Sequence, residues 1–119
     1  VAPTDAKAKE LSEAGITHHM KSFMAGGSKT GGYLGDISDK SGDEQFAYDN
    51  LMDGTILHGS PDTVLRKIEE CKAVGTTSLM LHYPPYYGQE ATLDMLRLFA
   101  REVLPHVYAM DVPRLTAAE

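Results

Sequence analysis

The sequence TILHGSPDTVLRKIEECKAVGTTSLMLHY, residues 55–83, contains the signals that decide the fold. Its centre predicts a helix that begins at Pro61. Ser60 can cap the free amides there, and a proline at the first helical position gives up no hydrogen bond. Apolar side chains recur at helical spacing from Val64 onward, and Gly75 is the expected stop. We therefore expect one well-capped helix here.

A short apolar run stands on each side of this helix. Residues 55–58 are rich in β-prone side chains, and residues 78–82 (SLMLH) are apolar without alternation. A run of the second kind is typical of a strand buried on both faces of a parallel sheet. The whole stretch therefore predicts a strand, a helix and a second strand, which is one βαβ unit.

The rest of the chain predicts further helices. One is expected to begin just after Thr4 and to reach about Ala25, and a short one covers 43–53. The strongest helical pattern covers 89–104 and is expected to end at Pro105. The predicted order is helix, loop, helix, strand, helix, strand, helix.

The segment 26–42 differs from its surroundings because it is rich in glycine, serine and aspartate. Such a segment has little to bury and much backbone entropy to lose, so it predicts a flexible loop. Loops of this length are linkers in some proteins and lids over a binding site in others. The sequence leaves both interpretations open.

Composition argues against several classes of protein. A net charge of −6 and a pI near 5.3 differ from the basic surface that a nucleic-acid-binding protein needs. No apolar stretch approaches the ~18 residues of a membrane span. Cys71 is the lone cysteine, so an internal disulfide cannot form, and we interpret it as a small core residue. We expect a cytoplasmic protein with no nucleic-acid or membrane partner.

Two runs resemble the C-terminal end of the luciferase-like flavin-dependent monooxygenases. They are HGSPDTVLRKIEECKAVGTTSLMLHYPP (58–85) and EATLDMLRLFAREVLPHV (90–107). That family closes with a Gly-Ser-Pro-Asp/Glu-Thr-Val helix, a glycine-led apolar strand, and a helix ending Leu-Phe-Ala-x-Glu-Val-x-Pro. The start VAPTDAKAKE (1–10) is also similar to a family helix that begins Thr-Asp-x-x-Ala. The resemblance covers residues 1–107 and leaves 108–119 as a C-terminal tail.

The resemblance implies an α/β fold: the C-terminal part, the last two to three βα units, of a TIM (β/α)8 barrel. Residues 26–42 would be a mobile Gly-rich loop over the mouth of the barrel. The family uses reduced FMN, or a deazaflavin in some branches, with O2 to insert oxygen into a small organic substrate. A flavin reductase would supply the reduced cofactor. The strands that make most flavin contacts have no counterpart here, so the resemblance assigns no catalytic residue.

The active site of a TIM barrel lies at the C-terminal ends of its strands. The candidates for the wall of the substrate pocket are therefore His58, His82, Tyr83, Tyr86 and Tyr87. Gly59 and Ser60 are weaker candidates for cofactor binding, because a helix start attracts anions. Each has a structural alternative: histidines bonded to neighbouring backbone, tyrosines packed on the surface, and a serine that only caps its helix. The histidine spacing predicts no metal site.

Two alternatives to an enzyme portion remain open at this point. Two parallel strands cannot make a self-sufficient sheet, so the chain is expected to form a homo-oligomer or to join a missing N-terminal barrel portion. In the first alternative, a stand-alone half-barrel self-associates and binds a hydrophobic ligand without catalysis. In the second, a partner chain completes the barrel. The oligomeric state and co-purification of a partner would distinguish them.

Overall fold

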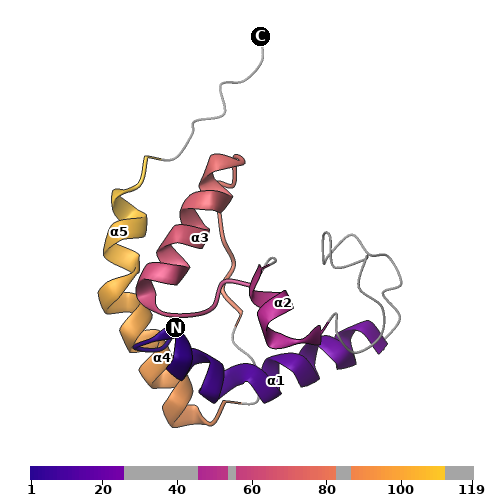
Figure 1. Cartoon of the computed structure of the whole chain (residues 1–119). Helices are drawn as coiled ribbons and strands as arrows, with labels where there is room; N and C mark the ends of the chain where they lie inside the picture. The colour runs from indigo at the N-terminus through magenta and orange to yellow at the C-terminus, as the bar shows by residue number, and fades with distance from the viewer. Residues whose placement is uncertain (26–45, 54–55, 83–86, 112–119) are drawn as a thin grey trace.

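The computed structural model describes residues 1–25, 46–53, 56–82 and 87–111. Regular structure in this part of the chain is helical (Figure 1). The helices are α1 (Asp5–Ala25), α2 (Tyr48–Asp53), α3 (Pro61–Ala73), α4 (Gln89–Glu102) and α5 (Leu104–Ala109).

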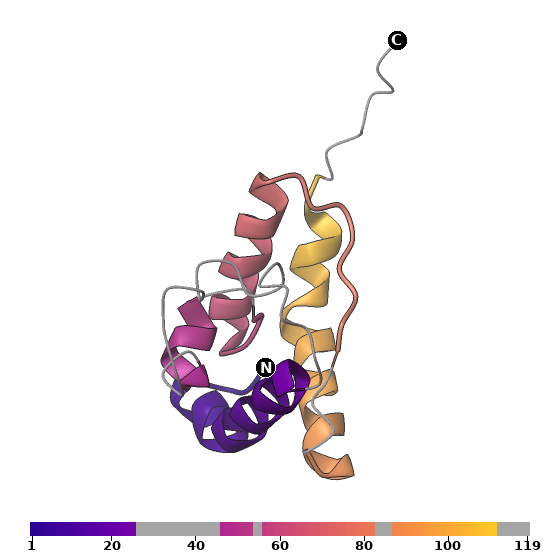
Figure 2. The ribbon, with the colours of Figure 1, turned by 90° about the vertical axis from the view of Figure 1, so that its right-hand side faces the viewer.

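The helices form two groups that meet near the N-terminus. Helix α2 lies on α1, while α3 stands beside α5, and α4 continues the line of α5 past the foot of α3 (Figures 1 and 2). Each group has its own apolar core. Ile16, Tyr48 and Leu51 are buried between α1 and α2. Val64 and Ile68 of α3 are buried against Val103, at the junction of α4 and α5.

The predicted start of α3 is confirmed in detail. The Ser60 hydroxyl accepts a hydrogen bond from the Thr63 amide at 3.3 Å, and Pro61 occupies the first turn. Gly75 follows the helix with a φ of +93°, a conformation that glycine adopts without strain. Local capping chemistry therefore fixes where this helix begins and where the chain turns away from it.

The other helices follow the sequence pattern with two shifts. Helix α1 ends at Ala25 and α2 ends at Asp53, as predicted, but α2 begins at Tyr48 and not at the predicted position 43. The last helix breaks earlier than expected, at Val103, and the chain resumes as α5 with Pro105 in its first turn. A proline is tolerated there because the amide it lacks would have no partner in a first helical turn.

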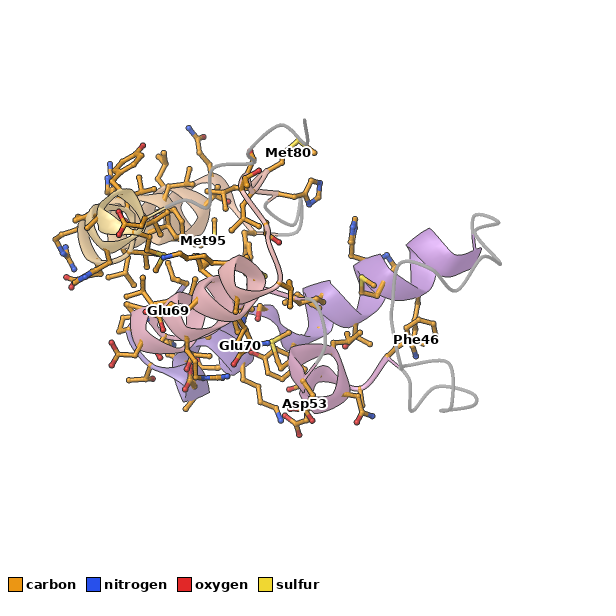
Figure 3. All side chains as sticks on the ribbon, turned by 90° about the horizontal axis from the view of Figure 1, so that it is seen from above. Phe46, Asp53, Glu69, Glu70, Met80 and Met95 are labelled. Carbon is orange, nitrogen blue, oxygen red and sulfur yellow. The ribbon has the colours of Figure 1, made fainter. Side chains whose placement is uncertain are left out.

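The prediction of a parallel-strand TIM barrel portion is wrong, because the described residues contain helices and no strand. The described residues of the two expected strands, 56–58 and 78–82, are assigned no regular structure. Met80 is 95% exposed and lies at the outer edge of the molecule, and Leu79 and Leu81 are also exposed (Figure 3). An apolar run becomes a strand only where a neighbour pairs with its backbone amides and carbonyls.

The structure describes the start of the predicted C-terminal tail but not the predicted loop. Helix α5 continues through the predicted boundary between 107 and 108 and ends at Ala109. The predicted loop 26–42 and the last residues of the predicted tail, 112–119, lie outside the described residues.

Candidate functional site

A buried polar cluster lies where the two helix groups meet. Its members are Ser12 of α1, Tyr48 of α2, His58 before α3, and Tyr87 before α4. We call these four residues the His58 cluster. The His58 side chain is only 8% exposed and Ser12 only 1%, so the cluster is largely shielded from water.

Both ring nitrogens of His58 contact a tyrosine. The Tyr48 hydroxyl lies 2.9 Å from Nδ1, and the Tyr87 hydroxyl lies 3.3 Å from Nε2. The Ser12 hydroxyl donates to the Ala8 carbonyl at 2.6 Å, and its oxygen also interacts with both tyrosine hydroxyls. Tyr48, His58 and Tyr87 therefore form a hydrogen-bonded chain, with Ser12 beside both tyrosines.

The surroundings keep His58 uncharged at neutral pH. Burial lowers the pKa of His58 to about 4, and the positive charges of the Val1 amino group and Lys67 act in the same direction. Burial also raises the pKa of Tyr48 and of Tyr87, so both keep their protons. A neutral imidazole has one donor and one acceptor nitrogen, which two tyrosine hydroxyls can satisfy.

Lys67 supports the cluster from α3. Its ammonium group donates to the backbone carbonyls of Met52 and Ile56, the latter at 3.0 Å. The first carbonyl belongs to α2, and the second precedes His58 by two residues. This buried lysine therefore holds together the segments that carry Tyr48 and His58.

His58 borders two pockets of different character. The first, which we call the apolar pocket, has a volume of about 490 Å³ and also contacts Tyr87. Aliphatic side chains of α1 and α4 form much of its wall: Ala8, Leu11, Ala91, Met95 and Leu98. Charged side chains also line it: Lys7, Asp94, Arg97 and Arg101. This pocket suits a mainly apolar molecule of small size.

The second pocket, which we call the polar pocket, has a volume of about 400 Å³ and contacts Tyr48. Its charged lining residues are Asp5, Lys9, Asp49, Asp53, Arg66 and Lys67. Lys9 binds the Asp49 carboxylate at 2.8 Å. His58 therefore separates a charged pocket that suits water from an apolar pocket that suits an organic molecule.

The start of α3 is already occupied by a carboxylate of this chain. Asp5 accepts hydrogen bonds from the Ser60 amide at 2.6 Å and the Thr63 hydroxyl at 2.9 Å. Gly59 has a φ of +135°, and a Cβ there would lie 2.6 Å from the Asp5 carboxylate. A flavin phosphate would meet this negative charge, so Gly59 and Ser60 do not fit a phosphate site.

The structure brings together two of the predicted pocket residues, His58 and Tyr87. His82 lies elsewhere, with its exposed ring 5.6 Å from that of His19. Tyr83 and Tyr86 lie outside the described residues. The sequence reasoning missed the polar roles of Ser12 and Tyr48. Tyr48 lies within the short helix predicted over 43–53, but nothing in the sequence marks its hydroxyl, and nothing singles out one serine on α1.

Comparisons with protein families, with curated proteins and with solved structures found no match for this chain. Within the described ranges, no three metal-binding side chains converge. None of the described helices is both long enough and apolar enough to cross a bilayer. The chemistry of the His58 cluster and its two pockets is therefore the structural basis for assigning a function.

Proposed function

We propose that this chain supplies the substrate side of a flavin-dependent monooxygenase, which inserts oxygen into a small organic molecule using reduced flavin and O2. One observation carries the proposal. His58 and Tyr87, two residues that the resemblance to luciferase-like monooxygenases marks as pocket wall, meet at 3.3 Å and both line the apolar pocket. They stand 29 positions apart in the sequence, so only folding brings them to one site.

The roles of the residues follow from their chemistry. The aliphatic wall would hold the body of the substrate and exclude water. The Tyr87 hydroxyl would orient it by a hydrogen bond to a substrate oxygen, and neutral His58 would hold that hydroxyl in place. In this proposal the start of α3 does not hold the flavin phosphate, because Asp5 fills it.

The proposal leaves the flavin, FMN or a deazaflavin, to be held by other residues. The cofactor, when bound, supplies the redox chemistry. A flavin reductase would deliver it in reduced form, and the cytoplasm is the proposed compartment. Because the phosphate has no place at Gly59 and Ser60, we expect the isolated chain to bind FMN no more tightly than millimolar. A stoichiometric micromolar titration would contradict this expectation.

A second candidate function is ligand binding without catalysis by a self-associating protein. It is favoured by the apolar pocket itself, whose lining is largely aliphatic. A binding protein needs such a pocket and no cofactor.

The test uses tagged protein purified from the cells that produce it, together with whatever it assembles with. The material is supplied with NADH, a flavin reductase, FMN and ¹⁸O2, and small organic compounds that bind are analysed by mass spectrometry. Incorporation of ¹⁸O that falls at least tenfold in Tyr87→Phe, but not in the exposed Tyr108→Phe, supports the monooxygenase. Compounds that bind and remain unoxidised in the flavin-supplied complex support the binding protein.

A further inference from the structure

We propose that the His58 cluster is a proton relay that joins the polar pocket to the apolar pocket. The residues lie in the order that such a relay requires. Tyr48 lines the polar pocket, Tyr87 lines the apolar pocket, and His58 lies between them and borders both. The distances along this line are 2.9 Å and 3.3 Å, which are within the hydrogen-bonding range.

The hydrogen bonds of the His58 ring can run in two directions. In one, Tyr48 donates to Nδ1 and Nε2–H donates to Tyr87. In the other, Tyr87 donates to Nε2 and Nδ1–H donates to Tyr48. Both directions use the same two contacts, so the tyrosines alone do not fix one tautomer of His58.

The transfer step balances without leaving a charge on the protein. A basic oxygen of a ligand in the apolar pocket takes the Tyr87 proton, and Nε2–H replaces it. Tyr48 then protonates Nδ1 and regains a proton from water in the polar pocket. The net change moves one proton from that water to the ligand. The reverse transfer, from the ligand through the same three residues to water in the polar pocket, restores the first tautomer.

The charged groups around His58 are compatible with a neutral relay. Lys67 is held by two carbonyls on one side, and the Asp5 carboxylate is bonded to Ser60 and Thr63. With the Val1 amino group, these are the charges that act on the ring. None of them hydrogen-bonds to it, so no fixed charge locks one tautomer. The relay does not depend on a flavin and holds equally for a binding protein.

The first test is made on the wild-type protein and needs a variant only to assign the signals. In ¹⁵N-histidine-labelled protein, the ring nitrogens of His58 are assigned by their disappearance in His58→Gln. The relay predicts ¹⁵N shifts between those of the two pure tautomers, because both are populated and interconvert. Shifts that correspond to a single fixed tautomer would overturn the proposal and leave a static buried histidine.

The second test measures how fast the His58 ring proton exchanges with water. Tyr48→Phe removes the contact with the polar pocket while keeping the aromatic ring. We expect exchange at least tenfold slower in this variant and unchanged exchange in Tyr108→Phe, which lies on the exposed surface. An unchanged rate in Tyr48→Phe would show that protons reach His58 by another route. If Tyr48→Phe does not fold, 3-fluorotyrosine is placed at position 48 instead. Its more acidic hydroxyl should speed the exchange, and an unchanged rate would overturn the proposal.

Discussion

The Asp5 carboxylate accepts a hydrogen bond from the Ser60 backbone amide at 2.6 Å, across 55 positions of sequence. The same carboxylate accepts from the Thr63 hydroxyl. The first turn of α1 therefore caps the start of α3 from outside, in addition to the cap that Ser60 makes within its own helix. This contact holds together the two helix groups directly beside His58.

Removing this carboxylate should weaken the whole fold. In Asp5→Ala, the Ser60 amide and Thr63 hydroxyl lose their partner, and we expect a loss of about 1 kcal/mol in the free energy of unfolding. Urea denaturation followed by circular dichroism measures it. Glu69→Ala, on the exposed part of α3, is the control and should change stability by less than about 0.5 kcal/mol. Equal losses in the two variants would mean that the contact contributes nothing.

A methyl group at Gly59 should be more damaging. It would meet the Asp5 carboxylate at 2.6 Å, and the φ of +135° is unfavourable for any other residue. We expect Gly59→Ala to cost at least about 2 kcal/mol, since strain and a broken cap add. Gly88→Ala is the control, because no atom lies within 4 Å of the Cβ it would introduce. A thermal melting temperature unchanged in Gly59→Ala would refute this arrangement.

His58 should make the fold sensitive to mild acid. Its pKa falls from 6.5 to about 4 on folding, so between these values the unfolded chain binds a proton that the folded chain does not. Stability therefore decreases as pH falls through this window, with a slope of at most about 1.4 kcal/mol per pH unit. Urea midpoints measured at several pH values in wild type and in His58→Gln test this. The variant should be less stable near pH 7 and should lose less stability on acidification.

The ammonium group of Lys67, and not only its aliphatic stem, should contribute to the stability of the fold. Lys67→Met keeps the aliphatic stem but leaves the Met52 and Ile56 carbonyls without their donor. We expect a loss of about 1–3 kcal/mol, the usual cost of unsatisfied buried polar groups. Lys72→Met, near the end of the same helix, should change little. If Lys67→Met unfolds at the same urea concentration as wild type, water satisfies these carbonyls.

The helices could be predicted from sequence because their signals are local. Ser60, Pro61 and Gly75 define α3 through contacts within a few residues, and the structure reproduces them. The break at Val103 was not visible, because Pro105 is equally compatible with the end of one helix and the first turn of another.

The strands were predicted wrongly because a strand is not a local property. Residues 78–82 have the composition of a buried strand, yet pairing depends on a second segment that composition does not specify. For a similar reason, only two of the four residues of the His58 cluster could be predicted from the sequence. His58 and Tyr87 were predicted from their positions after the two expected strands, whereas Ser12 and Tyr48 enter the cluster only through the packing of α1 and α2.

The extended segment 76–82 has a consequence for the behaviour of the protein in solution. It presents three exposed apolar side chains in a row, Leu79, Met80 and Leu81, which is a composition typical of aggregation-prone segments. We expect solubility to be limited by this segment and to fall steeply with concentration. Met80→Lys should raise the concentration at which light scattering first appears, and Val74→Lys, an equal change of charge at another exposed site, should raise it less. The residues that were wrongly predicted to form a strand thus limit the concentration at which the protein stays in solution.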